Sequence, residues 1–128
     1  MFLDTTIVVE VLRSRRESER FGRILEAIED DPLFISMLQL AELSDWCLEN
    51  SIDLSEWISR LKGIVGVVPL TEDICLEGSR IKREMREHGM SKFSLLDGII
   101  LASARSIDQK LLTTDSDFRG AEDAVVIG

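Results

Sequence analysis

The sequence predicts an α/β fold: a mostly parallel central sheet covered by helices on both faces, forming a three-layer α/β/α sandwich. Short apolar runs alternate with longer segments whose apolar residues recur at helical spacing. Strands that alternate with helices favour parallel pairing through helical crossovers. No internal repeat, low-complexity tract or Gly/Ser linker divides the 128 residues. We therefore expect one domain over residues 1–128, a length that can bury a sizeable core.

The first half of the chain contains signals for two strands and four helices. Phe21, Ile24, Leu25 and Ile28 mark one helical face. Asp30-Asp31-Pro32 breaks that helix, and Ser36 with Gln39 forms a capping-box pattern that opens the next. We expect strands over 1–3 and 33–35, and helices over 5–12, 17–29, 37–49 and 55–62.

The second half begins with a β-branched run at 64–68. Thr71 can cap the following helix, whose Ile74, Gly78, Ile81 and Met85 form one buried stripe. His88-Gly89 is a normal helix end. We expect strands over 63–70, 110–113 and 125–127, and helices over 71–88 and 94–106.

Composition restricts the class of protein. Apolar residues make up 45% of the chain, which excludes a disordered tail, and no apolar run approaches the length of a membrane span. Asp4 follows after three residues, so we expect no secretory signal and a cytoplasmic location. The net charge of −9 argues against loose, charge-driven binding of nucleic acid, although it permits a nucleic acid held locally.

Acidic residues stand at positions where a folding chain normally places apolar residues or turns. Asp4 ends the first apolar strand, Asp97 interrupts the run Leu95–Leu101, and Asp115 and Asp117 follow Leu111–Thr114. Glu42 lies inside the apolar start of the third expected helix. Asp4 and Asp115 fall beyond the carboxyl ends of strands, where open α/β sheets bind ligands. Carboxylates within about 4 Å repel by roughly 4 kcal/mol per pair, so a cluster needs a cation.

Helix capping is the alternative role for some of these residues. Asp4 can cap the following helix, and Ser94 with Asp97 matches a capping box. The apolar neighbours of Asp97 argue against a purely capping role. Gly98 is a poor helix former, so we expect it to mark a close approach of the backbone to another element. The stretch that begins at Asp115 resembles the start of an EF-hand calcium loop. The match is excluded because Arg119 and Val126 stand at the fifth and twelfth positions, where an EF-hand has calcium ligands. Because all the candidate ligands are carboxylate oxygens, they favour binding of one or two Mg²⁺ or Mn²⁺ ions.

Basic residues form two groups in this acidic chain. Each group either lies on a solvated helix face or contacts phosphate or a partner. The candidates for RNA or partner contact are Arg13, Arg16, Arg83 and Arg86.

Four motifs in order along the chain resemble the PIN domain, specifically the VapC-type toxins of bacterial and archaeal toxin–antitoxin pairs. The motifs are Leu3-Asp4-Thr5-Thr6, Ile35-Ser36-Met37 through Ala41-Glu42-Leu43, Ser94-Leu95-Leu96-Asp97-Gly98-Ile99-Ile100 and Leu112-Thr113-Thr114-Asp115-Ser116-Asp117-Phe118. The resemblance implies a metal-dependent ribonuclease. It also implies an RNA substrate, a small antitoxin partner and a homodimer.

The same resemblance implies roles for individual residues. Asp4, Glu42, Asp97 and Asp115 match acidic catalytic and metal-binding positions, and Asp117 matches an additional metal-binding one. Thr113 and Thr6 match supporting positions. Gly98 stands where similar proteins usually carry Ala.

Two other functions remain open. A metal-dependent phosphohydrolase on a Rossmann-like sheet would use similar carboxylates. The haloacid-dehalogenase type is disfavoured, because its nucleophilic motif DxDx[TV] needs a second Asp that Leu3-Asp4-Thr5-Thr6 lacks. A non-catalytic binding module would use the acidic residues as helix caps alone.

Overall fold

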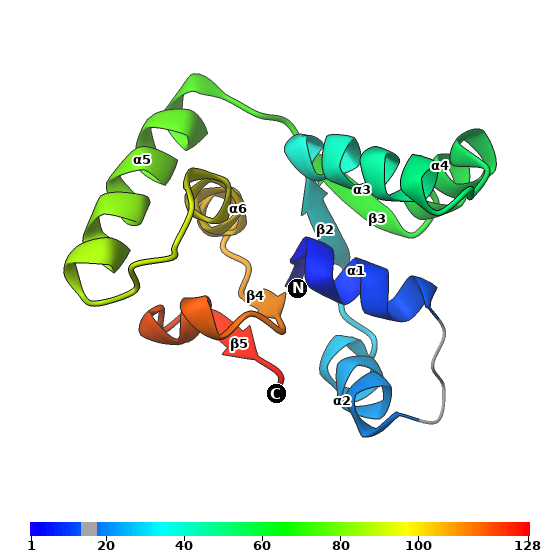
Figure 1. Ribbon diagram of the computed structural model, residues 1–128, viewed down its shortest axis with the longest axis horizontal. Helices are drawn as coiled ribbons and strands as arrows, with labels where there is room; N and C mark the ends of the chain where they lie inside the picture. Colours follow the sequence, from blue (N-terminus) through cyan, green and yellow to red (C-terminus); the bar gives the residue numbers. More distant parts are fainter. Residues whose placement is uncertain (14–17) are drawn as a thin grey trace.

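Five parallel strands form the central sheet of the computed structural model, in the order β3-β2-β1-β4-β5 (Figure 1). The structure describes residues 1–13 and 18–128. Each neighbouring pair of strands is parallel, which confirms the predicted fold class. The strands are β1 (Phe2–Leu3), β2 (Leu33–Ser36), β3 (Val65–Val68), β4 (Leu111–Thr113) and β5 (Ala124–Val126).

Helices cover both faces of this sheet. Helices α1 to α4 lie on one side, and α5 and α6 lie on the other (Figure 1). None of the described helices is long and apolar enough to cross a membrane. The helices are α1 (Thr5–Leu12), α2 (Glu19–Ile28), α3 (Met37–Glu49), α4 (Leu54–Lys62), α5 (Glu72–Glu87) and α6 (Leu95–Ser106), followed by the short 3-10 helix η1 (Ser116–Gly120).

Adjacent residues of the central strands enter two different cores. Phe2 and Leu111 pack with residues of α5 and α6, whereas Leu3 and Leu112 pack with residues of α1 to α4. Successive side chains of a strand point to opposite faces, so a sheet buried on both faces needs apolar residues at every position. This requirement explains the short, continuous apolar runs in the sequence.

Side-chain caps set most helix boundaries at the predicted residues. Ser36 and Gln39 form the expected capping box of α3. Thr71 caps the start of α5, and His88 is its C-terminal cap, followed by Gly89 with φ of 95°. The predicted helix over 17–29 is shorter, because Ser18 caps α2 and Ile28 ends it; residue 17 lies outside the described residues.

Two local predictions differ from the structure. Leu25 is 47% exposed, so it does not belong to the buried face of α2 that contains Ile24. The sequence also did not predict η1, which begins where Asp115 accepts a hydrogen bond from the backbone nitrogen of Asp117.

Two glycines set the distance between α5 and α6. A Cβ on Gly98 would lie 2.2 Å from the backbone oxygen of Gly78, and one on Gly78 would lie 2.9 Å from the backbone nitrogen of Ile99. Backbone atoms in packed helices cannot move aside as a flexible side chain can. Gly98 therefore marks a close backbone approach, as predicted, and the neighbour is α5.

Replacing Gly98 tests this crossing. We expect Gly98→Ala to destabilise the protein by about 1–3 kcal/mol through overpacking, although Ala favours a helix by about 1 kcal/mol. Urea denaturation gives the free energy of unfolding. The matched control is Gly22→Ala in α2, where nothing lies within 4 Å of the added Cβ and we expect a gain in stability. Equal stability of the two variants would contradict the tight crossing.

Candidate active site

The predicted acidic residues gather at the carboxyl ends of β1 and β4, which are neighbours in the sheet. Asp4 directly follows β1, and Asp115 lies two residues beyond β4. From β1 the chain continues to β2 on one side, while β4 lies on the other side. The direction of winding reverses at this point, and such reversals open the ligand crevices of α/β sheets.

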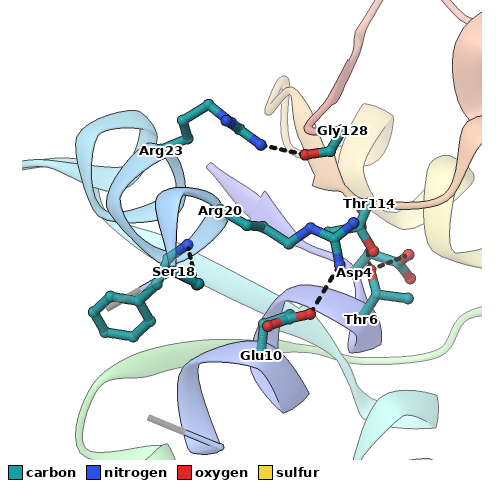
Figure 2. A network of polar contacts seen from close by, with 9 residues as sticks. Asp4, Thr6, Glu10, Ser18, Arg20, Arg23, Thr114 and Gly128 are labelled. Atoms are coloured by element: carbon teal, nitrogen blue, oxygen red, sulfur yellow. Dashed lines mark hydrogen bonds and ion pairs between the residues drawn. The ribbon is translucent and has the colours of Figure 1, made fainter. Parts of the chain in front are cut away.

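Asp4 is the most buried of the acidic residues, with 5% of its surface exposed. Its Oδ2 accepts hydrogen bonds from the hydroxyls of Thr113 at 2.6 Å and Thr6 at 3.1 Å. Its Oδ1 accepts from the backbone nitrogen of Thr5 at 2.9 Å, which caps α1. Figure 2 shows Asp4 beside Thr6 and Thr114. Both predicted supporting threonines therefore hold this carboxylate in place.

A second chain of hydrogen bonds positions Glu42. The Thr5 hydroxyl donates to Glu42 Oε1 at 3.0 Å and accepts from Gln39 Nε2 at 3.3 Å. Gln39 is fully buried, and its Nε2 also donates to the Leu3 carbonyl at 2.7 Å. The sequence predicts Gln39 only as part of a helix cap and indicates no separate role for Thr5. No local pattern signals these contacts, because they join residues more than 30 positions apart.

Asp97 is both a helix cap and a member of the acidic group. Its Oδ2 accepts from the backbone nitrogen of Ser94 at 2.9 Å, and its own backbone nitrogen donates to Ser94 Oγ at 3.0 Å. This is the capping box that the sequence suggested. The side chain is nevertheless half-buried and interacts electrostatically with the other carboxylates.

The loop after β4 is held by polar and aromatic contacts. The backbone nitrogen of Asp115 donates to the Thr113 hydroxyl at 3.0 Å, and that of Asp117 donates to Asp115 Oδ1 at 2.9 Å. Phe118 is buried and packs edge-on against Phe93, with ring centroids 5.2 Å apart. Phe93 immediately precedes Ser94, so this contact joins the Asp115 loop to the start of α6.

Burial raises the pKa of three of the carboxylates. Desolvation is the largest cause of the raised pKa of Asp4, Glu42 and Asp97. The charge of Asp97 adds to the rise in pKa of Asp4 and Glu42, and the charges of Asp115 and Asp117 add to that of Asp97. The charge of Asp97 thus interacts with those of the four other acidic residues: Asp4, Glu42, Asp115 and Asp117.

The donor set suits a hard divalent cation. These side chains present carboxylate oxygens, which Mg²⁺ and Mn²⁺ prefer and which Zn²⁺ sites rarely use alone. Over residues 1–13 and 18–128, no three His, Cys, Asp or Glu side chains lie close enough to hold a metal ion as they stand. Asp97 and Asp115 are instead turned toward backbone donors. Ion binding would require them to rotate toward the fixed carboxylate of Asp4.

The predicted basic contact residues lie in different surroundings. Arg13 is exposed at the end of α1, and Arg16 lies outside the described residues. Arg83 and Arg86 lie on α5, where Arg86 Nε donates to the Phe93 carbonyl at 2.8 Å.

Two arginines of α2 tie this helix to the rest of the fold, as Figure 2 shows. Arg20 pairs with Glu10 of α1 at 3.0 Å, and Arg23 donates to the backbone carbonyl of Gly128.

The chain matches the PIN domain over residues 1–123. It belongs to the PIN domain family. Solved structures share this PIN fold at low sequence identity. A toxin–antitoxin complex from Klebsiella pneumoniae is 22% identical with a TM-score of 0.79, covering 99% of this chain and 97% of the other. VapBC-1 from nontypeable Haemophilus influenzae is 23% identical with a TM-score of 0.73, covering 96% and 92%.

A third solved structure, VapBC2 from Rickettsia felis bound to a DNA fragment from its promoter, is 18% identical. Its TM-score is 0.69, covering 98% of this chain and 95% of the other. No curated protein matches the chain. The family and the fold agree with the resemblance found in the sequence.

The raised pKa of Asp97 leads to a prediction about stability. A folded-state pKa above the unfolded value means that stability is lost as the pH rises through the folded pKa. Asn cannot ionise, and its side-chain oxygen can still accept from Ser94. We therefore expect Asp97→Asn to unfold at higher urea than the parent at pH 7 without divalent ions. We expect the difference to shrink below the ordinary Asp pKa of about 3.9.

The control for this measurement is Asp45→Asn, which alters an exposed carboxylate on α3. Its urea midpoint should stay close to that of the parent both at pH 7 and below the ordinary Asp pKa of about 3.9. Destabilisation of Asp97→Asn by the same amount at both pH values would show that the cap, and not the buried charge, dominates.

Proposed function

We propose that this PIN domain is a Mg²⁺- or Mn²⁺-dependent endoribonuclease, the VapC-like toxin of a toxin–antitoxin pair. The observation that carries the proposal is the gathering of Asp4, Glu42, Asp97 and Asp115 where β1 and β4 end. PIN domains are generally nucleases. Hydrolysis of a phosphodiester bond is the reaction that such a carboxylate group supports best.

The residues divide into a fixed part and an adjustable part. Asp4 is the fixed ligand, because three hydrogen bonds and burial restrict its rotation. Asp97 and Asp115 are half-buried and would turn toward it, Glu42 is held near it by Thr5, and Asp117 would assist. When bound, one or two divalent ions supply an activated water and stabilise charge on the phosphate. Thr5 orients Glu42, and Thr113 orients both Asp4 and the backbone of Asp115.

The partners follow from the same proposal. The similar structures are a toxin–antitoxin complex and VapBC assemblies, which supports a small antitoxin as partner of this chain. We also propose a homodimer that acts on RNA in the cytoplasm.

The alternatives are separable by experiment. The caps that a binding module requires are present at Asp4 and Asp97, but caps alone would bind no Mn²⁺ at a defined stoichiometry in isothermal titration. A phosphohydrolase that uses an aspartyl nucleophile would form phosphoaspartate, whereas attack by water forms no covalent intermediate.

Removing a single carboxylate tests the catalytic role. We expect Asp4→Asn and Asp97→Asn to lose RNA cleavage in Mn²⁺ by a factor on the order of 10²–10³ or more, because each removes a carboxylate that would hold the divalent ion, and that ion would stabilise charge on the phosphate. Cleavage of labelled RNA measures the rate, and circular dichroism checks that the fold persists. The exposed Asp45→Asn variant is the control and should cleave at the parent rate. If either site variant cuts RNA as fast as the parent, this mechanism is wrong.

Expression in a host tests the toxin assignment. We expect induced expression of the chain to arrest growth, and co-expression with the neighbouring open reading frame to relieve the arrest. Asp97→Asn should arrest nothing, because arrest requires cleavage. Arrest by Asp97→Asn at the same protein level would separate toxicity from the proposed nuclease.

A further inference from the structure

A shallow groove runs along α5 beside the start of α6. Its volume is about 540 Å³, within the range of ligand pockets. Five of its lining residues are polar or charged, and one is apolar. The lining residues are Ser79, Lys82, Arg83, Arg86, Glu87 and Leu95.

The groove is positively charged although the chain has a net charge of −9. Its lining contains three cationic side chains, those of Lys82, Arg83 and Arg86, and one carboxylate, that of Glu87. Residues three and four apart share a helix face, which places these cations in one row. Arg80 belongs to the same helix but lines a different cavity, with Glu77 and Arg105. The cations of the groove are therefore a property of one face of α5.

These cations are available to a ligand. Lys82 makes no ion pair or hydrogen bond with any other residue that the structure describes. Arg83 pairs with Glu87 at 3.3 Å through exposed side chains, and such pairs contribute little stability. Arg86 uses Nε to bind the Phe93 carbonyl, which leaves its terminal nitrogens for other acceptors. By contrast, Arg20 and Arg23 bind other parts of the fold.

The groove is connected to the candidate active site through the start of α6. Arg86 binds the carbonyl of Phe93, and the next residue, Ser94, makes the capping box with Asp97. Leu95 of the same helical turn forms part of the groove wall and is 45% exposed. A strand lying in the groove would therefore pass the helix end that holds Asp97.

We propose that this groove binds backbone phosphates of single-stranded RNA next to the bond that is cleaved. The inference rests on the proposed ribonuclease function and assigns its substrate path. Ammonium and guanidinium groups in a row suit consecutive phosphates. A protein interface would need an apolar centre, and Leu95 is the single apolar residue in the lining. A local groove also explains how an acidic protein can hold RNA.

The test compares two double variants with the same change of charge. Lys82→Gln with Arg83→Gln removes two groove cations and breaks the exposed Arg83–Glu87 pair. The control, Lys62→Gln with Arg80→Gln, removes two exposed cations outside the groove and breaks the exposed Arg80–Glu77 pair. Arg86 stays intact because it holds the loop before α6. Fluorescence anisotropy measures binding of a short labelled single-stranded RNA of mixed sequence, in EDTA and over a range of salt.

The expected result is weaker binding by the groove variant alone. Its Kd should rise on the order of tenfold near physiological salt, and the slope of log Kd against log salt should fall by about 1.4, or about 0.7 per phosphate contact. The control should match the parent, and Lys82→Arg with Arg83→Lys should retain affinity.

Three results would overturn the inference. The first is equal Kd and slope for the groove and control variants, and the second is no RNA binding by the parent. Unchanged RNA binding combined with lost binding to the neighbouring open reading frame's product would also overturn it, in favour of a protein contact. Because the assay reads binding without metal, its failure is distinct from a failure of the proposed catalysis.

Discussion

The 2.6 Å hydrogen bond between the hydroxyl of Thr113 and the carboxylate of Asp4 links the end of β4 to the end of β1. The backbone nitrogen of Asp4 adds a second link, donating to the Leu112 carbonyl at 2.9 Å. A buried carboxylate is costly unless donors surround it. Its raised pKa shows that the donors present do not offset desolvation completely. Burial therefore disfavours the charged form of Asp4, and carboxylates with such shifted pKa values are common at functional sites.

Helix packing brings the second half of the site to this anchor. Gly78 and Gly98 allow α5 and α6 to pack closely, and α6 is buried from Gly98 to Ala104. Asp97 directly precedes that buried stretch, so its position is set by the helix crossing as well as by its cap. The Phe93–Phe118 contact then fixes the loop before α6 against η1. Core packing and site geometry are thus coupled, and a change in the packing of α5 against α6 would shift the position of Asp97.

The distribution of charge supports the proposed action of this acidic protein on an anionic substrate. The carboxylates are concentrated at the ends of β1 and β4, where a cation would neutralise them. Arg20 and Arg23 of α2 make internal contacts, whereas Lys82, Arg83 and Arg86 of α5 line a groove. Net charge governs long-range encounter, but a local row of cations governs contact once the substrate is close, because screening limits the range to about 10 Å.

The sequence alone determined the alternation of strands and helices and the caps at Ser36, Thr71 and Ser94, and it singled out the acidic residues that the fold brings near the ends of β1 and β4. These are local properties, since periodicity and capping depend on residues a few positions apart. The exposure of Leu25 and the contacts of Thr5 with Glu42 and of Gln39 with Leu3 came from the tertiary structure alone. They depend on strand order and helix placement, which bring together residues 30 or more positions apart and which no local pattern specifies.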